Sequence, residues 1–304
     1  MEQQRVRVIV PATTANMGPG FDTLGMALGL YNIVELESTT DGRITVSVEG
    51  EGAGELPCDE SNLVCRAASR LWEQVDFPVE GFKVHLINNI PLARGLGSSA
   101  AAIVGSLVAA NLLSGGRLSA DEILALATEF EGHPDNAAPA LLGGFVVSVK
   151  DGDQVRAMQL PVPPRLRAVV AIPDFELSTE AARNALPKEV SMQDATFNIS
   201  RTAMLVGALA TGQMRYLRHA FQDRLHQPYR ASLIPGFEKV VAAGQAAGAR
   251  GVVLSGAGPT VIAFYTNREQ GGLIGAAMKK AFAEAGVKCE TLLTSLVSHG
   301  ARVA

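Results

Sequence analysis

A glycine loop followed by two serines is the strongest chemical signal in the sequence. It reads Pro91-Leu92-Ala93-Arg94-Gly95-Leu96-Gly97-Ser98-Ser99-Ala100-Ala101, between an expected strand and an expected helix. Glycines let the backbone approach a phosphate closely, and the start of a helix adds unpaired N–H groups and a positive dipole. The hydroxyls of Ser98 and Ser99 could reach a phosphate oxygen or Mg²⁺.

Three phosphate-binding interpretations compete for this loop. Gly95-x-Gly97-x-x-Ala100 matches a permissive dinucleotide fingerprint, but no second strand ending in an acidic residue follows about 20 residues on. A Walker loop requires Gly-Lys-Ser/Thr, and this loop has no lysine. The third interpretation is a lysine-free ATP loop. The alternative without a ligand is a tight turn between a strand and a helix.

Two further glycine-containing segments lie near the ends of the chain. Residues 11–24 carry Asn16 and Asp22, and residues 254–260 read Leu-Ser-Gly-Ala-Gly-Pro-Thr. Together with the loop over 91–101, they resemble the GHMP kinases, the family of galactokinase, homoserine kinase, mevalonate kinase and phosphomevalonate kinase. Because three motifs occur in order, the resemblance covers nearly the whole chain.

Within this family the chain is most similar to the bacterial homoserine kinases. The similar segments are Ala15-Asn16-x-Gly18-x-Gly20-Phe21-Asp22, Glu131-Gly132-His133-Pro134-Asp135-Asn136-Ala137-Ala138-Pro139-Ala140, Gly143-Gly144, Ser178-Thr179-x-x-Ala182-Arg183, Pro228-Tyr229-Arg230 and Leu233-Ile234-Pro235-Gly236. The resemblance implies ATP-dependent phosphorylation of the side-chain hydroxyl of L-homoserine to O-phospho-L-homoserine, a step toward threonine.

L-Homoserine offers an ammonium, a carboxylate and a hydroxyl. Asp22, with Asn16 on the same loop, suits the ammonium, and the guanidinium groups of Arg183 and Arg230 suit the carboxylate. The resemblance assigns the same positions to the substrate and adds Thr179 and Asn136. Taken singly, each of these residues could equally be an ordinary solvated side chain.

For ATP, the resemblance places the triphosphate on residues 95–101, with the rest of the 91–101 loop and, less specifically, Asn62 as further contacts. Mg²⁺ would be held by Ser99 and a glutamate, since hard oxygen ligands fit this ion. Glu129 and Glu131 both precede the His-Pro-Asp-Asn segment. We favour Glu131 because it adjoins Gly132, as in the family.

The catalytic set inferred from the resemblance is Ser99, Glu131 and Asn136. Mevalonate and galactose kinases of the family are thought to use an aspartate base, whereas homoserine kinases have an asparagine there, here Asn136. Our hypothesis is that no side chain acts as a conventional base and that the proton goes to the γ-phosphate or water. Asp135 is the rival base, and adjacent residues are not both expected to face the substrate.

The chain length of 304 residues predicts two domains. The most linker-like point is Val162-Pro163-Pro164, which suggests an N-terminal domain over 1–160 and a C-terminal domain over 161–304. Strands and helices interleave without a regular βαβ alternation, which favours an α+β fold. The resemblance implies a ribosomal-protein-S5-like N-terminal lobe and a ferredoxin-like C-terminal lobe, with the active site between them.

The expected elements are short strands and amphipathic or buried helices. Strands are expected over 5–11, 32–38, 44–49, 82–86, 143–149, 167–172, 251–254 and 261–265, and helices over 61–72, 98–113, 119–130, 179–186, 198–209, 214–221, 237–247 and 271–285. Residues 12–22 are expected to form a loop. Ser119 and Glu122 fit a capping box.

Composition excludes several classes of protein. The net charge of −4 disfavours binding of nucleic acid through bulk positive charge. The longest apolar stretch, about 100–113, is too short to span a bilayer, and residues 1–6 lack the layout of a leader peptide. Three widely spaced cysteines fit neither a disulfide framework nor a zinc site. We therefore expect a cytoplasmic protein, and the family suggests a homodimer.

Two alternatives stay open at this point. One is another kinase of the family, such as one acting on mevalonate, for which Asp22 would lack an ammonium partner. The other is a non-catalytic ligand sensor, in which a damaged phosphate loop would be expected. His133 could orient a phosphate or bond the backbone, whereas His219, His226 and His299 lack metal-ligand spacing.

Overall fold

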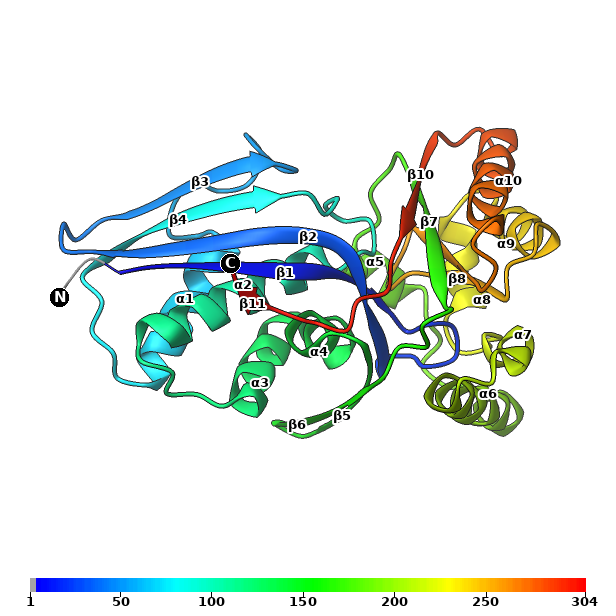
Figure 1. Ribbon diagram of the computed structural model, residues 1–304, viewed down its shortest axis with the longest axis horizontal. Helices are drawn as coiled ribbons and strands as arrows, with labels where there is room; N and C mark the ends of the chain where they lie inside the picture. Colours follow the sequence, from blue (N-terminus) through cyan, green and yellow to red (C-terminus); the bar gives the residue numbers. More distant parts are fainter. Residues whose placement is uncertain (1–3) are drawn as a thin grey trace.

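The computed structural model describes residues 4–304 and shows two lobes, each built on its own β-sheet (Figure 1). Residues 1–3 belong to the segment in which we expect no leader peptide, and they lie outside the described residues. Helices and strands mix in both lobes, which confirms the α+β class predicted from the sequence. In the part of the chain described here, no helix is long and apolar enough to cross a membrane.

The first lobe is a sheet in the order β11-β1-β2-β4-β3, joined at β2 by a β5–β6 hairpin. Its strands are β1 (Arg5–Ala15), β2 (Leu24–Thr39), β3 (Ile44–Gly50), β4 (Gly81–Asn88), β5 (Phe145–Asp151), β6 (Gln154–Leu160) and β11 (Arg302–Val303). Only β3 and β4 pair in parallel among these described strands. The chain therefore ends beside its first strand.

Four helices cover one face of this sheet, namely α1 (Leu63–Gln74), α2 (Ser98–Leu113), α3 (Ala120–Glu131) and α4 (Pro134–Leu142) (Figure 1). Helix α2 lies against β1 and β2, and a Cβ atom on Gly105 would lie 2.6 Å from the Val34 side chain. Glycine thus allows this central helix to approach the sheet, which fixes where its N-terminus points.

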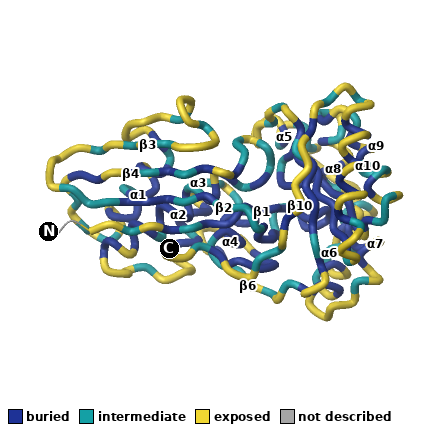
Figure 2. The backbone as a smooth tube through the Cα atoms, turned by 45° about the horizontal axis from the view of Figure 1, so that its top comes forward, coloured by how far each residue is buried: buried dark blue, intermediate teal, exposed yellow. Residues whose placement is uncertain are grey.

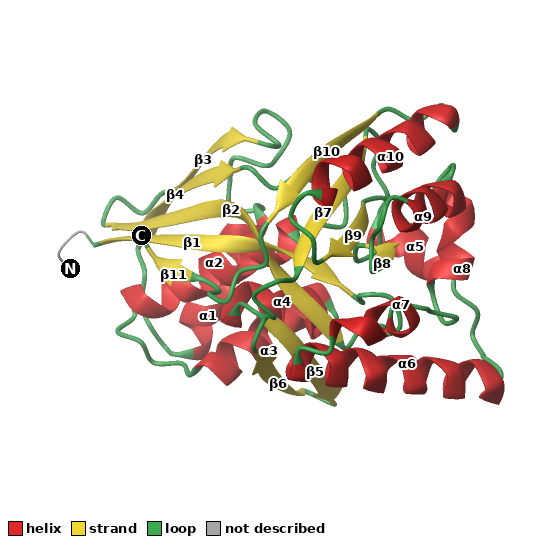
Figure 3. Cartoon of the chain, turned by 45° about the vertical axis from the view of Figure 1, so that its right-hand side comes forward, coloured by secondary structure: helices red, strands yellow, loops and turns green. Residues whose placement is uncertain are grey.

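The second lobe contains a four-stranded sheet in the order β10-β7-β9-β8 (Figure 3). Its strands are β7 (Arg167–Pro173), β8 (Gly251–Leu254), β9 (Val261–Tyr265) and β10 (Cys289–Thr294), and its helices are α5 (Thr179–Asn184), α6 (Met192–Thr211), α7 (Leu217–Ala220), α8 (Gln227–Arg230), α9 (Phe237–Ala246) and α10 (Gln270–Glu284). Short 3₁₀ turns cover Met214–Tyr216 and Ala231–Leu233.

Strand β7 divides its side chains between two apolar cores, because successive residues of a strand point to opposite faces. Ala168 and Val170 belong to the larger core, which continues into the first lobe, whereas Val169 and Ala171 belong to a smaller core beneath α9 and α10. Strand β7 is therefore buried on both faces, and one apolar core connects the two lobes.

Three segments meet where the lobes join: the end of β1 with the loop after it, the loop before α2, and the loop after β8. Backbone hydrogen bonds connect them directly. Residues 11–20 are buried without exception (Figure 2). The Ser255 hydroxyl donates to the Gly95 carbonyl at 2.6 Å, and its oxygen lies 2.9 Å from the Thr14 hydroxyl, which can donate to it. Gly95 has φ +75°, and a Cβ atom there would lie 2.2 Å from the Ser255 carbonyl oxygen. Only glycine fits this close approach.

Most expected elements are present, and the differences have physical causes. Residues 12–15, expected in a loop, continue β1 because they pair with residues 25–28 of β2 across a register shift at Pro11/Ala12. Helices α4 and α8 and strands β6, β10 and β11 were not expected. Pro139 lies inside α4, where proline is disfavoured, whereas α8 and β11 are short, and β6 and β10 have many exposed residues and no clear alternation. The capping box of Ser119 and Glu122 is confirmed.

All three cysteines are free thiols: Cys58 is exposed, whereas Cys65 and Cys289 are buried. Burial raises the pKa of the Cys65 thiol to about 12. The division of the chain at residue 160 stays a prediction, and β11 pairs with the sheet of the first lobe.

Replacing Gly95 with alanine tests the contact between the loops. The matched control is Gly115→Ala, because Gly115 also has positive φ (+87°) but has no atom within 4 Å of an added Cβ. The control should lower the free energy of unfolding by about 1 kcal/mol, the penalty of placing alanine in the left-handed backbone conformation. Gly95→Ala should cost about 1–3 kcal/mol more, the usual cost of overpacking. Equal losses in chemical denaturation would contradict a tight loop junction.

Candidate active site

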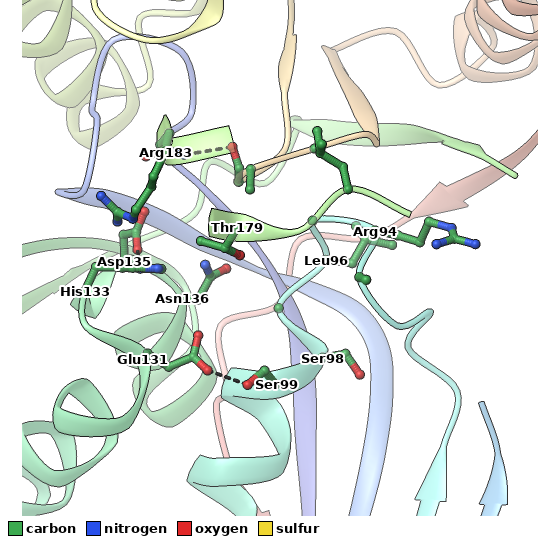
Figure 4. A pocket seen from close by; sticks show the side chains of 18 of the residues that line it. Arg94, Leu96, Ser98, Ser99, Glu131, His133, Asp135, Asn136, Thr179 and Arg183 are labelled. Carbon is green, nitrogen blue, oxygen red and sulfur yellow. Dashed lines mark hydrogen bonds and ion pairs between the residues drawn. The ribbon is translucent and has the colours of Figure 1, made fainter. Parts of the chain in front are cut away.

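A pocket lies between the lobes, at the meeting point of the three loops (Figure 4). Its lining comes from both lobes: Asn16, Asp22, Pro91, Ala93, Arg94, Gly95, Leu96, Gly97, Ser98, Ser99, Glu131, His133, Asp135, Asn136, Leu177, Thr179, Arg183, Arg230, Gly256, Ala257 and Gly258. All six residues predicted to contact the substrate are among them. So are Ser99, Glu131 and most of the predicted phosphate loop.

The start of α2 forms the floor of this pocket. Its N-cap residue is Gly97, in a left-handed conformation, and no side chain caps the helix. The first N–H groups of a helix have no partner within it, so they are available to an anion. A Cβ atom on Gly97 would lie 1.9 Å from the Thr13 hydroxyl, which explains the glycine.

The two serines of the loop have different surroundings. The Ser98 hydroxyl is buried and donates to the Ile90 carbonyl at 3.1 Å, so it holds the loop to the end of β4. The Ser99 hydroxyl donates to the Glu131 carboxylate at 2.6 Å (Figure 4). Only Ser99 therefore presents its hydroxyl to the pocket beside an acidic group.

Glu131 lies at the end of α3, and burial is the main cause that raises the pKa of its carboxyl. The alternative, Glu129, instead pairs with Arg70, 3.4 Å away on the surface. The geometry thus brings Glu131, and not Glu129, to the phosphate loop. Two hard oxygen donors, from Ser99 and Glu131, are the ligands that Mg²⁺ accepts.

A second group of possible ligand atoms also lines the pocket. The ligand atoms of Asp22, His133 and Asp135 all lie within 4.8 Å of one another. Each already has a partner, because Asp22 pairs with Arg183 and His133 pairs with Asp135. Ser99 and Glu131 are likewise bonded to each other, so both groups satisfy their own polar atoms.

The first turn of α4 presents Asp135 and Asn136 to the pocket together, contrary to the expectation that only one would face it. Both residues belong to the pocket lining, together with His133, the N-cap residue of the helix. The Asn136 Oδ1 accepts a hydrogen bond from the Thr13 hydroxyl at 2.8 Å, which directs the amide nitrogen elsewhere. The amide group is thus fixed by β1.

His133 bonds a side chain and not the backbone. Its Nδ1 lies 2.5 Å from Asp135 Oδ1. Burial opposes protonation of this imidazole, but the hydrogen bond and the charge of Asp135 outweigh burial and raise the pKa of His133. The two side chains form an ion pair when His133 is protonated.

The residues expected to bind an ammonium and a carboxylate pair with each other. Arg183 donates to both carboxylate oxygens of Asp22, at 2.9 and 3.1 Å, and both side chains are about one-third exposed (37% and 35%). Asn16 accepts a hydrogen bond from the Asp22 N–H at 3.0 Å and donates to the Gly256 carbonyl at 2.9 Å. Thr179 begins α5 and lines the same wall.

Arg230 is the second guanidinium of the pocket, and it is 2% exposed. Its Nε donates to the Ala182 carbonyl at 3.1 Å, and its Nη1 donates to the Gly256 carbonyl at 3.2 Å. Burial is the main cause that lowers the pKa of this guanidinium. Arg183 and Arg230 both lie near the Phe21 ring, at 5.7 and 5.3 Å from its centre.

Some predicted residues lie outside the pocket lining. Asn62 is the N-cap of α1: its Oδ1 accepts from the Val64 N–H, and its Nδ2 donates to the Pro57 carbonyl. Its contact with adenine therefore stays a prediction. Leu92, Ala100 and Ala101 continue the loop and the helix behind the lining.

Sequence reasoning missed the residues that hold the site from behind. Thr13 gives no signal in the sequence, because its role depends on pairing with a residue 123 positions away. His226 was dismissed for lack of metal-ligand spacing. Its spacing of four residues from Arg230 on a short helix was the available signal, since such residues meet on one helix face.

Two family models match the chain. The model of the N-terminal domain of GHMP kinases matches residues 62–144, and the model of their C-terminal domain matches residues 205–284. A homoserine kinase from Moorella thermoacetica is 50% identical over 296 residues, which cover 97% of this chain and 99% of that protein. One from Desulfitobacterium hafniense is 46% identical over 300 residues, covering 98% and 99%.

Solved structures of relatives have the same fold. The crystal structure of homoserine kinase from Cytophaga hutchinsonii matches with a TM-score of 0.91 at 34% identity, covering 100% of this chain and 98% of that chain. Mevalonate kinase from L. major matches with a TM-score of 0.70 at 16% identity, covering 97% and 98%, a likeness of fold alone. The chain therefore belongs to the GHMP kinase family and, within it, to the homoserine kinases.

Proposed function

We propose that the chain transfers the γ-phosphoryl group of ATP to the side-chain hydroxyl of L-homoserine, giving O-phospho-L-homoserine for threonine biosynthesis. The observation that carries the proposal is the Asp22–Arg183 pair beside the buried Arg230 in one pocket. The relatives named homoserine kinase support the same reaction. A cytoplasmic location and a homodimer are part of the proposal on grounds of composition and family alone.

The charges of the pocket complement an amino-acid zwitterion. The Asp22 carboxylate, oriented by Asn16, suits the ammonium, and the guanidinium groups of Arg183 and Arg230 suit the carboxylate. Exposed ion pairs contribute only about 0–1 kcal/mol. The half-exposed Asp22–Arg183 pair can therefore open for the substrate at small cost, and each partner then gains an opposite charge. Thr179 lines the same part of the pocket.

For ATP, we propose that the phosphates lie on the loop over 91–101 and at the start of α2. The uncapped N–H groups and the helix dipole favour a negative charge at this place. Mg²⁺ would be held by Ser99 and Glu131, and it would neutralise charge on the phosphates. The buried Glu131 carboxylate fits this role, because a nearby cation would compensate for the water that it lacks.

We propose that no side chain acts as a conventional base in the transfer. The Asn136 amide has no basic group, and Thr13 fixes it so that its nitrogen can donate to a substrate oxygen. The Asp135 Oδ1 already lies 2.5 Å from His133 Nδ1, so this oxygen is engaged by the imidazole. The hydroxyl proton would then pass to the γ-phosphate or to water.

The direct test is ADP formation from MgATP with L-homoserine, L-serine, L-threonine, mevalonate and galactose. Turnover confined to L-homoserine, with phosphate on the side-chain oxygen, is expected. Preferred turnover of another alcohol would contradict the roles of Asp22, Arg183 and Arg230. ATP binding without any turnover would instead indicate a ligand sensor.

Ser99→Ala should weaken the binding of Mg²⁺ to the site. We expect the Mg²⁺ concentration for half-maximal rate to rise at least about tenfold, since even indirect partners of a metal contribute 10–100-fold in affinity. The control is Ser106→Ala in the same helix, whose buried hydroxyl donates to the Val64 carbonyl. That control should lose about 1 kcal/mol of stability and keep its Mg²⁺ dependence. An unchanged Mg²⁺ dependence in Ser99→Ala would remove Ser99 from the proposed ligands.

Asp135→Asn tests whether a base is needed. We expect kcat to fall less than about tenfold, because the proton does not go to this carboxylate. Loss of a general base typically costs about 10²–10⁴ in rate, and a fall of that size would contradict the proposal. Asn136→Ala serves for comparison and should lower kcat more than Asp135→Asn, because it removes the fixed amide.

A further inference from the structure

His226 lies behind the pocket and bonds two parts of it. The imidazole is fully buried, and it begins the short helix that carries Arg230. Its Nε2 lies 2.7 Å from the Gly18 carbonyl oxygen, and its Nδ1 lies 3.3 Å from Arg230 Nη1. One ring therefore bridges the loop that carries Asp22 and the buried guanidinium.

The chemistry of the two partners determines the form of this imidazole. A guanidinium has donors and no acceptor, so Nδ1 must accept from Arg230, and a carbonyl only accepts, so Nε2 must carry the proton. Only the neutral ring with its proton on Nε2 satisfies both bonds. Burial and the charge of Arg230 lower the pKa of His226, against the opposing effects of Asp223 and Asp22, and they favour this neutral form.

Other residues hold the ring in place. The buried Asp223 carboxylate accepts the N–H groups of Leu225, His226 and Gln227, which fixes the start of the helix, and it lies 3.5 Å from His226 Nε2. Phe21 stacks on the imidazole at 5.3 Å between ring centres. Rotation of the imidazole would therefore break its hydrogen bonds to the Gly18 carbonyl and to Arg230.

Resting on the proposed function, we propose that His226 is a positioning residue for the substrate carboxylate. Its neutral ring aims the Arg230 guanidinium into the pocket and ties it to the loop that carries Asp22. His226 is not in the lining of the pocket and acts through Arg230. Its loss should therefore weaken binding of L-homoserine and leave the ATP side of the site intact.

Two substitutions separate the two hydrogen bonds. His226→Asn places an amide oxygen close to the position of Nδ1, where it can still accept from Arg230. His226→Gln extends an amide nitrogen to the position of Nε2, where it can still donate to Gly18. We expect His226→Gln to raise the KM for L-homoserine about tenfold, the size of a hydrogen bond to a charged group. We expect His226→Asn to raise it clearly less, with kcat and the KM for MgATP near wild type in both.

A double-mutant cycle with Arg230→Lys tests whether His226 acts through Arg230. In the Arg230→Lys background, His226→Gln should cause little further rise in the KM for L-homoserine, because the guanidinium that it aims is gone. Additive increases in the KM for L-homoserine would overturn the proposal. So would equal rises in the KM values for L-homoserine and MgATP, which would mark a general structural role.

Thermal unfolding of each variant shows whether it is folded under the assay conditions. Should His226→Gln be unfolded there, the KM of His226→Asn for L-homoserine decides, because a tenfold or larger rise in a variant that keeps the bond to Arg230 would contradict the proposal. Wild-type protein that fails to phosphorylate L-homoserine overturns the proposed function itself. If the wild type phosphorylates L-homoserine but the effects of the two substitutions on KM are additive, only the role of His226 is overturned.

Discussion

The contact between the backbones of Gly95 and Ser255 governs the arrangement of the site. The Ser255 hydroxyl is hydrogen-bonded to the Gly95 carbonyl and the Thr14 hydroxyl. One side chain of the loop after β8 thus contacts both the loop before α2 and the end of β1. Because a side chain at Gly95 would collide with the Ser255 carbonyl, the loops can meet only with glycine there. The start of α2, the loop after β1 and the short helix of Arg230 all receive their positions from this junction.

The pocket balances its own charges with half-exposed or buried pairs. Asp22 pairs with Arg183, Asp135 pairs with His133, and Glu131 accepts from Ser99. Such pairs satisfy each polar group without a ligand, which avoids the cost of isolated buried charge. Under the proposed function, the Asp22–Arg183 pair also offers an opposite charge to each end of a zwitterion. In this proposal the substrate binds by replacing the contact between Asp22 and Arg183 with contacts to its own charged groups.

The sequence predicted the parts of the site that depend on local chemistry. The loop that leads into α2 and the capping box of α3 rest on neighbouring residues, and the structure has both where they were predicted. What it missed depends on contacts across the chain. Helix α4 packs against β1 and β2 despite Pro139 in its interior, and Thr13 meets Asn136 only in the folded protein.

The most direct measurement is a crystal structure with L-homoserine and a non-hydrolysable ATP analogue bound together. The account predicts the substrate carboxylate on Arg183 and Arg230, the ammonium on Asp22, and the hydroxyl facing the γ-phosphate at the start of α2. L-Homoserine bound away from Arg230, or a nucleotide whose phosphates avoid the loop over 91–101, would contradict it.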